Sequence, residues 1–519
     1  MENNKKLSKF SDICMTLIII MFIVCFGIAL FEAIAFNKNI LGFNYTPILM
    51  IIAAAVFVVL LILIYKKLIP KIKNNLKVAI AIIILMFIIQ LICSYFLLTN
   101  PAWDIKAAFN EACYINESTY SGYGYDINDT TIKEYSYTDM FPNNVFLVFI
   151  FSVIIKICNI FGFSNYVVAI TIFNTIAINL AIVLMYLLAR KLFGDKKALM
   201  ALIIAFITLP FYLYGPIYYT DSLSLIFPIA ILYFYLLSRD ENKKIRKVIW
   251  QILLGLFIFA AIKMKLTPSF MVIAIVMFEL LRKNFKVLIK NLALPVVITL
   301  VTSVIFTNLL TRADIINEDR SYSIKIPYQH WILMSLKGNA GYDVEEYKLT
   351  NEAGNYDQKV ESINARLKER LKEYGFSGVA KQLLKKITIT WGDGNYYVTE
   401  QLRAGRIRDI DIYEFLLPNG KYSSYYKYIP QGLHLSLLVF CLIAAFRAIK
   451  EKELDKDKMM LLIMILGVFV FLLLWETCSR YIFNIVPILI LVSIDGIDYI
   501  SFGKKEKEKL KLKEGKEEI

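Results

Sequence analysis

"VAIAIIILMFIIQLICSYFLL", residues 78–98, is the stretch that decides the fold of this chain. It contains no charged side chain, and a helix needs about 20 consecutive apolar residues to cross a bilayer. The stretch therefore predicts a transmembrane helix. It is followed at once by "TNPAWDIKAAFNEA", residues 99–112, which places two carboxylates, Asp104 and Glu111, close to the hydrocarbon.

Many further apolar runs of this kind follow along the chain. Of its 519 residues 58% are apolar, and the mean hydropathy of +0.57 is too high for a soluble protein of this length. The runs are continuous rather than alternating, which excludes a transmembrane β-barrel. We predict an all-α polytopic protein of the cell membrane. About twelve spans are expected, at 13–36, 46–65, 78–98, 166–188, 198–215, 222–238, 247–262, 268–281, 289–310, 432–449, 459–475 and 481–499.

The net charge of +15 has a topological explanation. Lys and Arg gather in short loops such as 66–77, as the positive-inside rule expects of cytoplasmic loops, so we predict no nucleic-acid partner. The apolar segment 145–163 carries Lys156 in its middle. If that segment crossed, the basic loops 189–197 and 238–247 would both lie outside. We therefore expect it to lie at the outer interface, with both chain termini in the cytoplasm.

Four regions follow from this topology. Residues 1–310 form a transmembrane core that includes a first outer loop at 99–143. Residues 311–431 are polar enough to form a small extracytoplasmic domain with outer juxtamembrane helices, because helix–helix connections are usually only 2–8 residues long. Residues 432–499 hold the C-terminal spans, and residues 500–519 form a charged cytoplasmic tail.

Two aspartates are the first candidates for chemistry. Asp104 follows the third span and Asp221 opens a later one, and both map to the outer side of the membrane. Charged groups at membrane depth are rare and usually functional. The alternative is that each only caps a helix. Glu111 lies two helical turns after Asp104, where it is either a second acid, a metal ligand or a solvated helix residue.

Three cations also map to the outer side, against the general charge bias. They are Lys263 and Lys265 in "AIKMKLTP" and Arg480 in "WETCSRYIFNIVP". An anionic lipid phosphate would partner them, and Arg suits this role through its bidentate donors. The alternative for Arg480 is an i,i+4 bridge to Glu476.

His330 and Trp331 open the long outer segment, in "IPYQHWILMSLKGNAGYD". An aromatic face stacks on the apolar side of a sugar ring, and an imidazole bonds its hydroxyls, so the two residues are candidates for substrate binding. The alternative is an amphipathic helix on the membrane with Trp331 in the aromatic belt. The pattern leaves a metal requirement open: no cofactor is predicted, and a divalent cation is compatible with the acidic residues.

The quoted motifs resemble a known family. A carboxylate in the first outer loop, a second in "YYTDSLSLIFP", the intervening "LARKLFGDKKALMALIIAFITLP" and the closing "SRYIFNIVPILILVSIDGI" are similar to GT-C-fold membrane glycosyltransferases. The nearest variety is the bacterial group of protein mannosyltransferases and aminoarabinose transferases. The resemblance covers about 78–310 and 459–499, and it lacks a DxD motif around Asp104.

The resemblance implies a function. The donor would be a sugar on a polyprenyl phosphate, and the acceptor an extracytoplasmic cell-wall polymer, lipid or protein. Asp104 would act as general base in a single displacement that inverts the anomeric carbon. Arg480 with Lys263 or Lys265 would stabilise the departing phosphate, and Asp221 would orient the acceptor or position a cation.

Two alternatives stay open. A transporter or flippase of lipid-linked glycans would carry its ionisable residues near the middle of the spans, whereas here they gather at the outer ends. A glycan polymerase or ligase would share the lipid carrier and the chemistry on the outer side.

Overall fold

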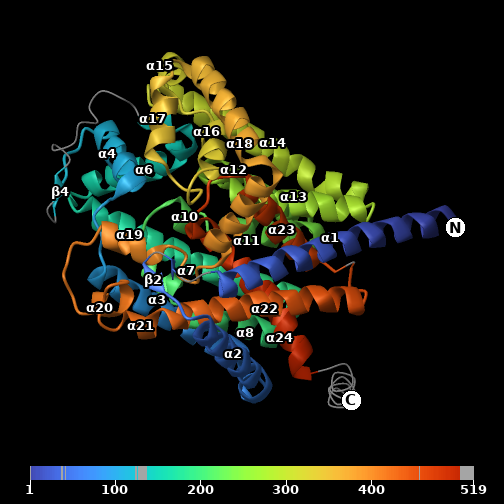
Figure 1. Ribbon diagram of the computed structural model, residues 1–519. Coiled ribbons are helices and arrows are strands. Elements are labelled where there is room, and N and C mark those ends of the chain that lie inside the picture. Colours follow the sequence, from blue (N-terminus) through green and yellow to red (C-terminus); the bar gives the residue numbers. More distant parts are fainter. Residues whose placement is uncertain are drawn as a thin grey trace.

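The structure is a computed structural model that describes residues 2–36, 39–40, 42–122, 125–126, 137–454 and 456–502 (Figure 1). Most of the tail predicted at 500–519 therefore lies outside the described residues. In the described part, strands form only two short antiparallel pairs, β1 (Asn39–Ile40) with β2 (Phe43–Asn44) and β3 (Ser121–Gly122) with β4 (Tyr125–Asp126). Helices make up the rest of the regular structure, so the predicted all-α class is confirmed.

Long apolar helices dominate the described chain. Ten helical segments are long and apolar enough to cross a membrane by length and composition, and α13 and α23 are shorter apolar helices, which agrees with a polytopic fold. The uninterrupted helices are α1 (Glu2–Ala35), α2 (Pro47–Leu63, continued by η1, Ile64–Leu68, and η2, Ile69–Lys71), α3 (Asn75–Phe96), α7 (Tyr166–Phe193), α12 (Lys244–Met264), α13 (Leu266–Leu281), α14 (Phe285–Arg312), α22 (Tyr428–Lys450) and α23 (Met459–Leu474). Their many exposed Ile, Leu, Val and Phe side chains suit contact with lipid.

The ten also include Pro142–Ile160 and two segments that are interrupted at one end, and the predicted span at 198–215 is interrupted as well. The segments are α8 (Asp195–Ile207) with α9 (Pro210–Leu213), α10 (Thr220–Leu223) with α11 (Phe227–Asp240), and η5 (Ser479–Ile485) with α24 (Val486–Phe502). The continuous span expected over 198–215 is thus broken after Ile207. Pro210 has no N–H to donate to the Phe206 carbonyl, and Tyr212 Oη donates to that carbonyl instead, at 2.6 Å. Irregular backbone at membrane depth is tolerated where it is buried in protein or lines a cavity, and the cavity lining includes Thr220 of α10 and Ser479 and Arg480 of η5.

The basic loops that were predicted to be cytoplasmic come together on one side of the molecule. Buried carboxylates join them there: Asp498 bonds Lys197 at 3.0 Å and Tyr65 at 3.1 Å, and Asp495 bonds Arg447 at 2.9 Å and Lys458 at 2.5 Å. We call this side the charged-loop face. It unites loops that lie more than 400 residues apart in the sequence, as the alternating topology requires.

The segment 145–163 returns to the side opposite the charged-loop face. Its helix α6 (Val145–Ile160) follows α4 (Trp103–Ile115), α5 (Tyr137–Met140) and η4 (Pro142–Asn144). Asn159 Nδ2 donates to Ser118 Oγ at 2.8 Å, and Tyr166 Oη, at the start of α7, donates to Asn159 Oδ1 at 2.6 Å. The start of α7 therefore lies near the end of α3. This is the arrangement expected if α6 does not cross the membrane.

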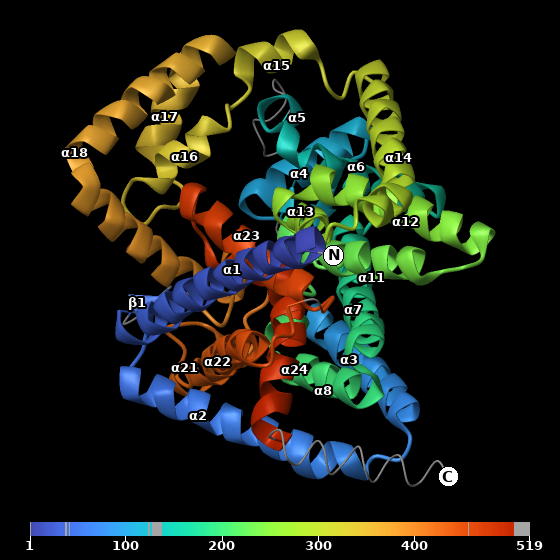
Figure 2. The same ribbon diagram turned by 90° about the vertical axis from the view of Figure 1, so that its right-hand side faces the viewer.

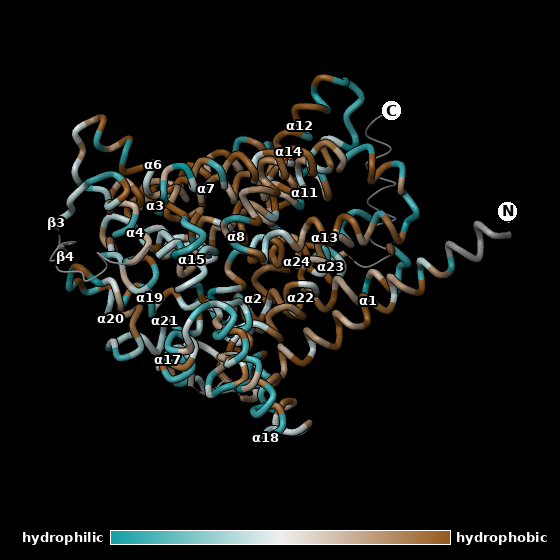
Figure 3. The backbone as a smooth tube through the Cα atoms, turned by 90° about the horizontal axis from the view of Figure 1, so that it is seen from above, coloured by the Kyte–Doolittle hydropathy of each residue, from teal (hydrophilic) through white to brown (hydrophobic). Residues whose placement is uncertain are grey.

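The polar stretch 311–431 folds as further helices around the bundle. They are α15 (Glu318–Ile324), α16 (Gln329–Ser335), α17 (Val344–Glu352), α18 (Tyr356–Trp391), α19 (Val398–Ala404), α20 (Tyr413–Leu416) and α21 (Ser423–Tyr426). Figure 2 shows α18 as a long bent arm beside α16 and α17, and Figure 3 shows that α17 and α18 are more hydrophilic than the bundle. The bend lies at Gly375, where φ is 54° and glycine avoids steric strain. Lys386 on α18 donates to the Leu473 carbonyl at 2.6 Å, which ties the arm to α23.

Candidate active site

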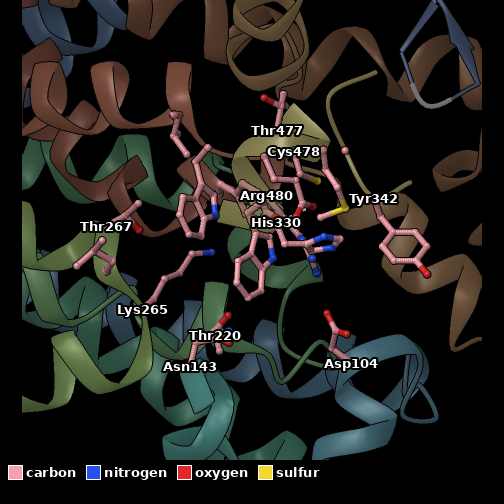
Figure 4. Close-up of a pocket in the computed structure, with 18 of the residues that line it drawn as sticks. Asp104, Asn143, Thr220, Lys265, Thr267, His330, Tyr342, Thr477, Cys478 and Arg480 are labelled. Atoms are coloured by element: carbon pink, nitrogen blue, oxygen red, sulfur yellow. Dashed lines mark hydrogen bonds between the residues drawn. The ribbon is translucent and has the colours of Figure 1, made fainter. Parts of the chain in front are cut away.

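One cavity of about 2080 Å³ opens where the helices end away from the charged-loop face (Figure 4). Elements that are distant in the sequence build it, namely α4, η4, α10, the α12–α13 junction, α16, α18, α23 and η5. Six of the residues predicted for the site line this cavity: Asp104, Lys263, Lys265, His330, Trp331 and Arg480. The structure thus brings together side chains that lie up to 376 residues apart in the sequence.

Asp104 lies in the first turn of α4, where the helix dipole stabilises a carboxylate. The residue before it, Trp103, is held at φ 49°, a left-handed conformation that is unfavourable for a residue with a side chain. Asp104 is not the N-cap of the helix, which is Ala102. Its Oδ2 instead accepts a hydrogen bond from Tyr219 Oη at 3.0 Å. The carboxylate is oriented by a distant tyrosine while it remains at the cavity.

Asp221 lies behind the cavity wall. Its side chain is 1% exposed, and it is not among the lining residues. Lys265 Nζ donates to Asp221 Oδ1, and Arg480 Nε lies 3.8 Å from Asp221 Oδ2. Both cations line the cavity, and the Asp221 carboxylate contacts them from the side that faces away from the cavity. This geometry suits a positioning role better than direct contact with a substrate.

Arg480 is held between aromatic rings. The guanidinium carbon lies 5.0 Å from the ring centre of Tyr219 and 5.4 Å from that of Tyr481, within the range of cation–π attraction. The i,i+4 bridge to Glu476 does not form, because α23 ends at Leu474 and Glu476 is not on a helix with Arg480. Glu476 accepts from Tyr481 Oη at 2.8 Å instead. The buried Nε of Arg480 faces Asp221 at 3.8 Å, beyond hydrogen-bond distance, so the pair is held by charge alone.

The charges that line the cavity are predominantly positive. Six cations line it: Lys263, Lys265, Lys325, Lys381, Lys385 and Arg480. The lining carboxyl groups are Glu32, Asp104 and Glu476. Burial raises the pKa of Glu476 and so favours its neutral form. A cavity with this excess of positive charge attracts an anionic ligand.

His330 and Trp331 form part of an aromatic wall. Trp331 stacks on Trp475 with ring centres 5.5 Å apart and planes 11° apart. His330 Nδ1 lies 2.8 Å from Thr350 Oγ1, and burial lowers the pKa of His330 to about 4, so the imidazole is neutral at pH 7. A neutral imidazole and a pair of stacked indoles present both apolar and polar surface to the cavity.

Glu111 is, with Asp221, one of the two predicted site residues that do not line the cavity. Its Oε2 accepts from the backbone N–H of Thr138, and its Oε1 accepts from Thr138 Oγ1, both at 2.9 Å. The side chain is 8% exposed. These contacts tie α4 to α5 and thereby support the first turn of α4.

Several residues that line the cavity were not predicted from the sequence. Tyr219, which orients Asp104, stands two residues before Asp221 in "YYTD", so its position beside a candidate acid was a usable signal. The cations Lys381 and Lys385 lie in a Lys-rich helix, and such a pattern is typical of an ordinary solvated surface. Within the described ranges, no group of three or more His, Cys, Asp or Glu residues lies together as a metal site would require.

Three comparisons relate the chain to known proteins. A family model described as "Conserved hypothetical integral membrane protein" matches residues 10–498. No curated protein matches the chain. Solved structures that match include the oligosaccharyltransferase AglB of Archaeoglobus fulgidus, in complex with an inhibitory peptide and a dolichol-phosphate, at 15% identity and a TM-score of 0.42, over 81% of this chain and 50% of that one. The apo form of the Archaeoglobus fulgidus oligosaccharyltransferase gives 14% and 0.43, over 84% and 52%.

A second protein among the matches is ArnT of Cupriavidus metallidurans bound to undecaprenyl phosphate, at 13% identity and a TM-score of 0.34, over 83% of this chain and 78% of that one. These proteins are GT-C-fold membrane glycosyltransferases, the group that the sequence resembles. The chain spans about half the length of the oligosaccharyltransferase chains that it matches. Because all these TM-scores are below 0.5, we base the proposals below on the cavity itself.

Proposed function

The chain belongs to the family of conserved hypothetical integral membrane proteins, and we propose that it is a membrane glycosyltransferase. In this proposal it moves a sugar from a polyprenyl-phosphate carrier to an acceptor in the cavity. One observation carries the proposal: a carboxylate and a group of cations face the same cavity and are joined through one tyrosine. The hydroxyl of Tyr219 donates to Asp104 at 3.0 Å, and the guanidinium carbon of Arg480 lies 5.0 Å from the centre of the Tyr219 ring.

The cationic side of the cavity suits the phosphate of the donor. Lys265 and Arg480 converge through Asp221, and Lys263 lies at the adjacent helix end with its Nζ 6.0 Å from the ring centre of Phe306. Fixed cations stabilise a phosphate most as it gains negative charge on departure, because the charges are already in place and need no reorganisation. The planar guanidinium of Arg480, which lines the cavity, suits a phosphate because it presents several N–H donors in a fixed geometry.

An apolar arm of the cavity suits the lipid part of the donor. Its lining includes Phe36 of the chain after α1, Leu384 of α18, and Phe471 and Leu472 of α23. Figure 2 shows α1 running past α23 and α18, and these three helices contact one another. A polyprenyl chain would pack against these side chains by the hydrophobic effect while its phosphate reaches the cations.

Asp104 is the base in this proposal. The acceptor hydroxyl loses its proton to Asp104 as its oxygen attacks the anomeric carbon of the donor sugar. The bond from that carbon to the phosphate oxygen breaks, and the polyprenyl phosphate leaves with both bonding electrons. A single displacement inverts the anomeric carbon, and base catalysis supplies about 10²–10⁴-fold of the rate. Tyr219 fixes the carboxylate, and Asp221 fixes the two cations.

The proposed orientation places the cavity on the extracytoplasmic side. The charged-loop face carries the basic loops, which the positive-inside rule assigns to the cytoplasm. The cavity lies at the other ends of the same helices, so the acceptor would be an extracytoplasmic glycan, lipid or protein. The region 311–431 is then the extracytoplasmic part of the protein, and the core consists of 1–310 and 432–499.

The experiment uses the full chain in nanodiscs with undecaprenyl phosphate as the probe. We expect saturable binding, measured by tryptophan fluorescence, that weakens at least tenfold, or about 1.4 kcal/mol, in Arg480→Gln. Lys244→Gln, which changes a cation at the start of α12 on the far side of the molecule, is the matched control. Equal binding by all three proteins would overturn the proposal.

A second measurement separates transfer from transport. Cell-wall glycans are compared in a deletion strain that carries the wild-type chain or Asp104→Asn. A transferase requires the base, so Asp104→Asn should lose one glycosyl modification and leave the lipid-linked precursor to accumulate. Restoration of the modification by Asp104→Asn would favour a flippase, because export needs no base.

A further inference from the structure

Three aromatic side chains surround the approach to Asp104. Trp103 is 52% exposed and Tyr342 is 67% exposed, although both are large rings that line the cavity. The ring of Tyr397 lies 6.4 Å from that of Trp103, at 47°. Burial and the charge of Asp104 both raise the pKa of Tyr342, which places its hydroxyl in the field of that carboxylate. Figure 4 shows Tyr342 and Asp104 on the same side of the cavity.

The two rings that face each other both stand on unfavourable backbone. Trp103 has φ 49°, and Tyr396 and Tyr397 have φ 52° and 66°. These are three of the eight described non-glycine residues with positive φ, and they meet at one place. Left-handed backbone is disfavoured for such residues and persists only where the surroundings determine it fully. Strain of this kind concentrates at functional sites, where it fixes a geometry before a ligand arrives.

A buried network holds the strained turn that carries Tyr397. Asp393 accepts from the backbone N–H of Asn395 at 2.9 Å, from that of Tyr397 at 2.8 Å, and from Ser479 Oγ at 2.6 Å. Tyr396 is fixed at both ends: its carbonyl accepts from the Tyr214 hydroxyl at 2.5 Å, and its own hydroxyl lies 2.9 Å from a ring nitrogen of His434. The network also binds the turn to η5, the element that carries Arg480.

We propose that Trp103, Tyr342 and Tyr397 form the acceptor subsite and that the acceptor is a saccharide chain. This inference rests on the proposed function and specifies its second substrate. Rigid aromatic rings with polar tips bind an amphipathic ligand at low entropic cost, and the C–H face of a sugar ring is such a surface. Asn143 and Thr220 line the cavity near Asp104 (Figure 4) and offer amide and hydroxyl partners for sugar hydroxyls.

A saccharide fits this subsite better than a peptide or a lipid. Extended peptides commonly bind by adding a strand to an exposed sheet edge, and none of the described strands lines the cavity. An acyl chain needs an apolar surface, and Leu384, Phe471 and Leu472 of the cavity lining suit it better than the hydroxyl-bearing rings of Tyr342 and Tyr397. The approach to Asp104 instead alternates ring faces with hydroxyl and amide groups.

The test uses the full chain in nanodiscs and saturation-transfer NMR. The probes are maltohexaose, cellohexaose and chitohexaose, with a Ser/Thr-rich hexapeptide as the competing class. We expect at least one saccharide to bind saturably with a Kd below about 10 mM, and Trp103→Ala and Tyr397→Ala each to weaken it at least tenfold. Trp103→Tyr, which keeps a ring, should retain most of the binding. Tyr425→Ala removes a tyrosine that is 72% exposed outside the cavity and should change nothing.

Undecaprenyl phosphate, titrated into the same variants, separates the two proposals. Trp103→Ala and Tyr397→Ala should bind it within twofold of the wild-type chain, which also shows that they fold. If undecaprenyl phosphate binds and no saccharide does, or if the hexapeptide binds instead, the saccharide subsite is wrong and the proposed transferase stands. Unchanged saccharide binding in Trp103→Ala also overturns the subsite. If undecaprenyl phosphate itself does not bind, the proposed function fails.

Discussion

Tyr219 donates a hydrogen bond to Asp104 across 115 residues of sequence, with 3.0 Å between its hydroxyl oxygen and Asp104 Oδ2. The same ring lies beneath the guanidinium of Arg480. One tyrosine therefore fixes the distance between the carboxylate and the cationic side of the cavity. In the proposed reaction this distance separates the attacking oxygen from the leaving phosphate, so a small change in the tyrosine should affect turnover more than binding.

The first prediction compares Asp104→Asn with Tyr219→Phe. Asp104→Asn removes the base and should lower kcat for sugar transfer by about 10²–10⁴-fold. Tyr219→Phe keeps the ring beneath Arg480 and loses only the hydroxyl, so we expect a smaller fall, about tenfold, with donor KM unchanged. The measurement is transfer from a radiolabelled polyprenyl-phosphate sugar in membranes.

The control for both variants is Asp409→Asn. Asp409 is 87% exposed, pairs with Arg406 at 3.3 Å and does not line the cavity. It should transfer sugar like the wild-type chain. Wild-type kcat in Asp104→Asn would remove the base assignment, and a raised donor KM with unchanged kcat in Tyr219→Phe would mean that the tyrosine serves binding instead.

The second prediction concerns stability at Asp221. Asp221→Asn leaves Lys265 and Arg480 buried without their carboxylate, and breaking a buried ion pair in this way costs about 3–5 kcal/mol. The variant should unfold at a clearly lower temperature in a fluorescence melt. Asp221→Asn combined with Lys265→Met removes one of the two unpaired cations, so it should regain a large part of the loss. Additive effects of the two substitutions would show that the pair is not coupled.

The sequence predicted those site residues that stand at the ends of apolar runs. Asp104, Lys263, Lys265 and Arg480 were recognised because a charge beside hydrocarbon is unfavourable unless a partner or a function compensates for it. That argument needs only the local sequence. The positive charge of the cavity could therefore be predicted from the sequence. Six of the eight residues that were predicted for the site line the cavity.

The remaining features depend on contacts between distant segments. Glu111 has the same helical spacing from Asp104 whether it faces the cavity or bonds Thr138, and only the packing of α5 on α4 decides between them. Gly392 and Gly394 indicate a turn in "TWGDGNYY", but nothing in the sequence indicates the left-handed backbone of Tyr396 and Tyr397. The break after Ile207 could have been predicted from Pro210, whose missing N–H removes one hydrogen bond of a helix.

The third prediction is a pH dependence of stability that comes from His330. Burial lowers its pKa to about 4, below the usual value of about 6.5. Between these values the unfolded chain binds a proton that the folded chain does not, so stability is fully present above about pH 6.5 and is lost as pH falls toward 4. The loss is at most about 3 kcal/mol at 1.36 kcal/mol per pKa unit. His330→Asn, which cannot protonate, should show a flatter melting profile between pH 4 and 6.5; equal slopes would exclude His330 as the source.

The fourth prediction concerns which side of the membrane each face meets. Gly194 joins α7 to α8, but its φ of 85° disfavours a cysteine, so Lys196→Cys in the exposed first turn of α8 is the better probe. An impermeant maleimide applied to intact cells should leave Lys196→Cys unlabelled and should label Asp409→Cys in the region 311–431. Permeabilised cells should label both, and the wild-type chain reports the background of its own seven cysteines. Labelling of Lys196→Cys from outside would reverse the proposed orientation and move the cavity to the cytoplasmic side, where a polyprenyl-phosphate sugar would have to be used before its export.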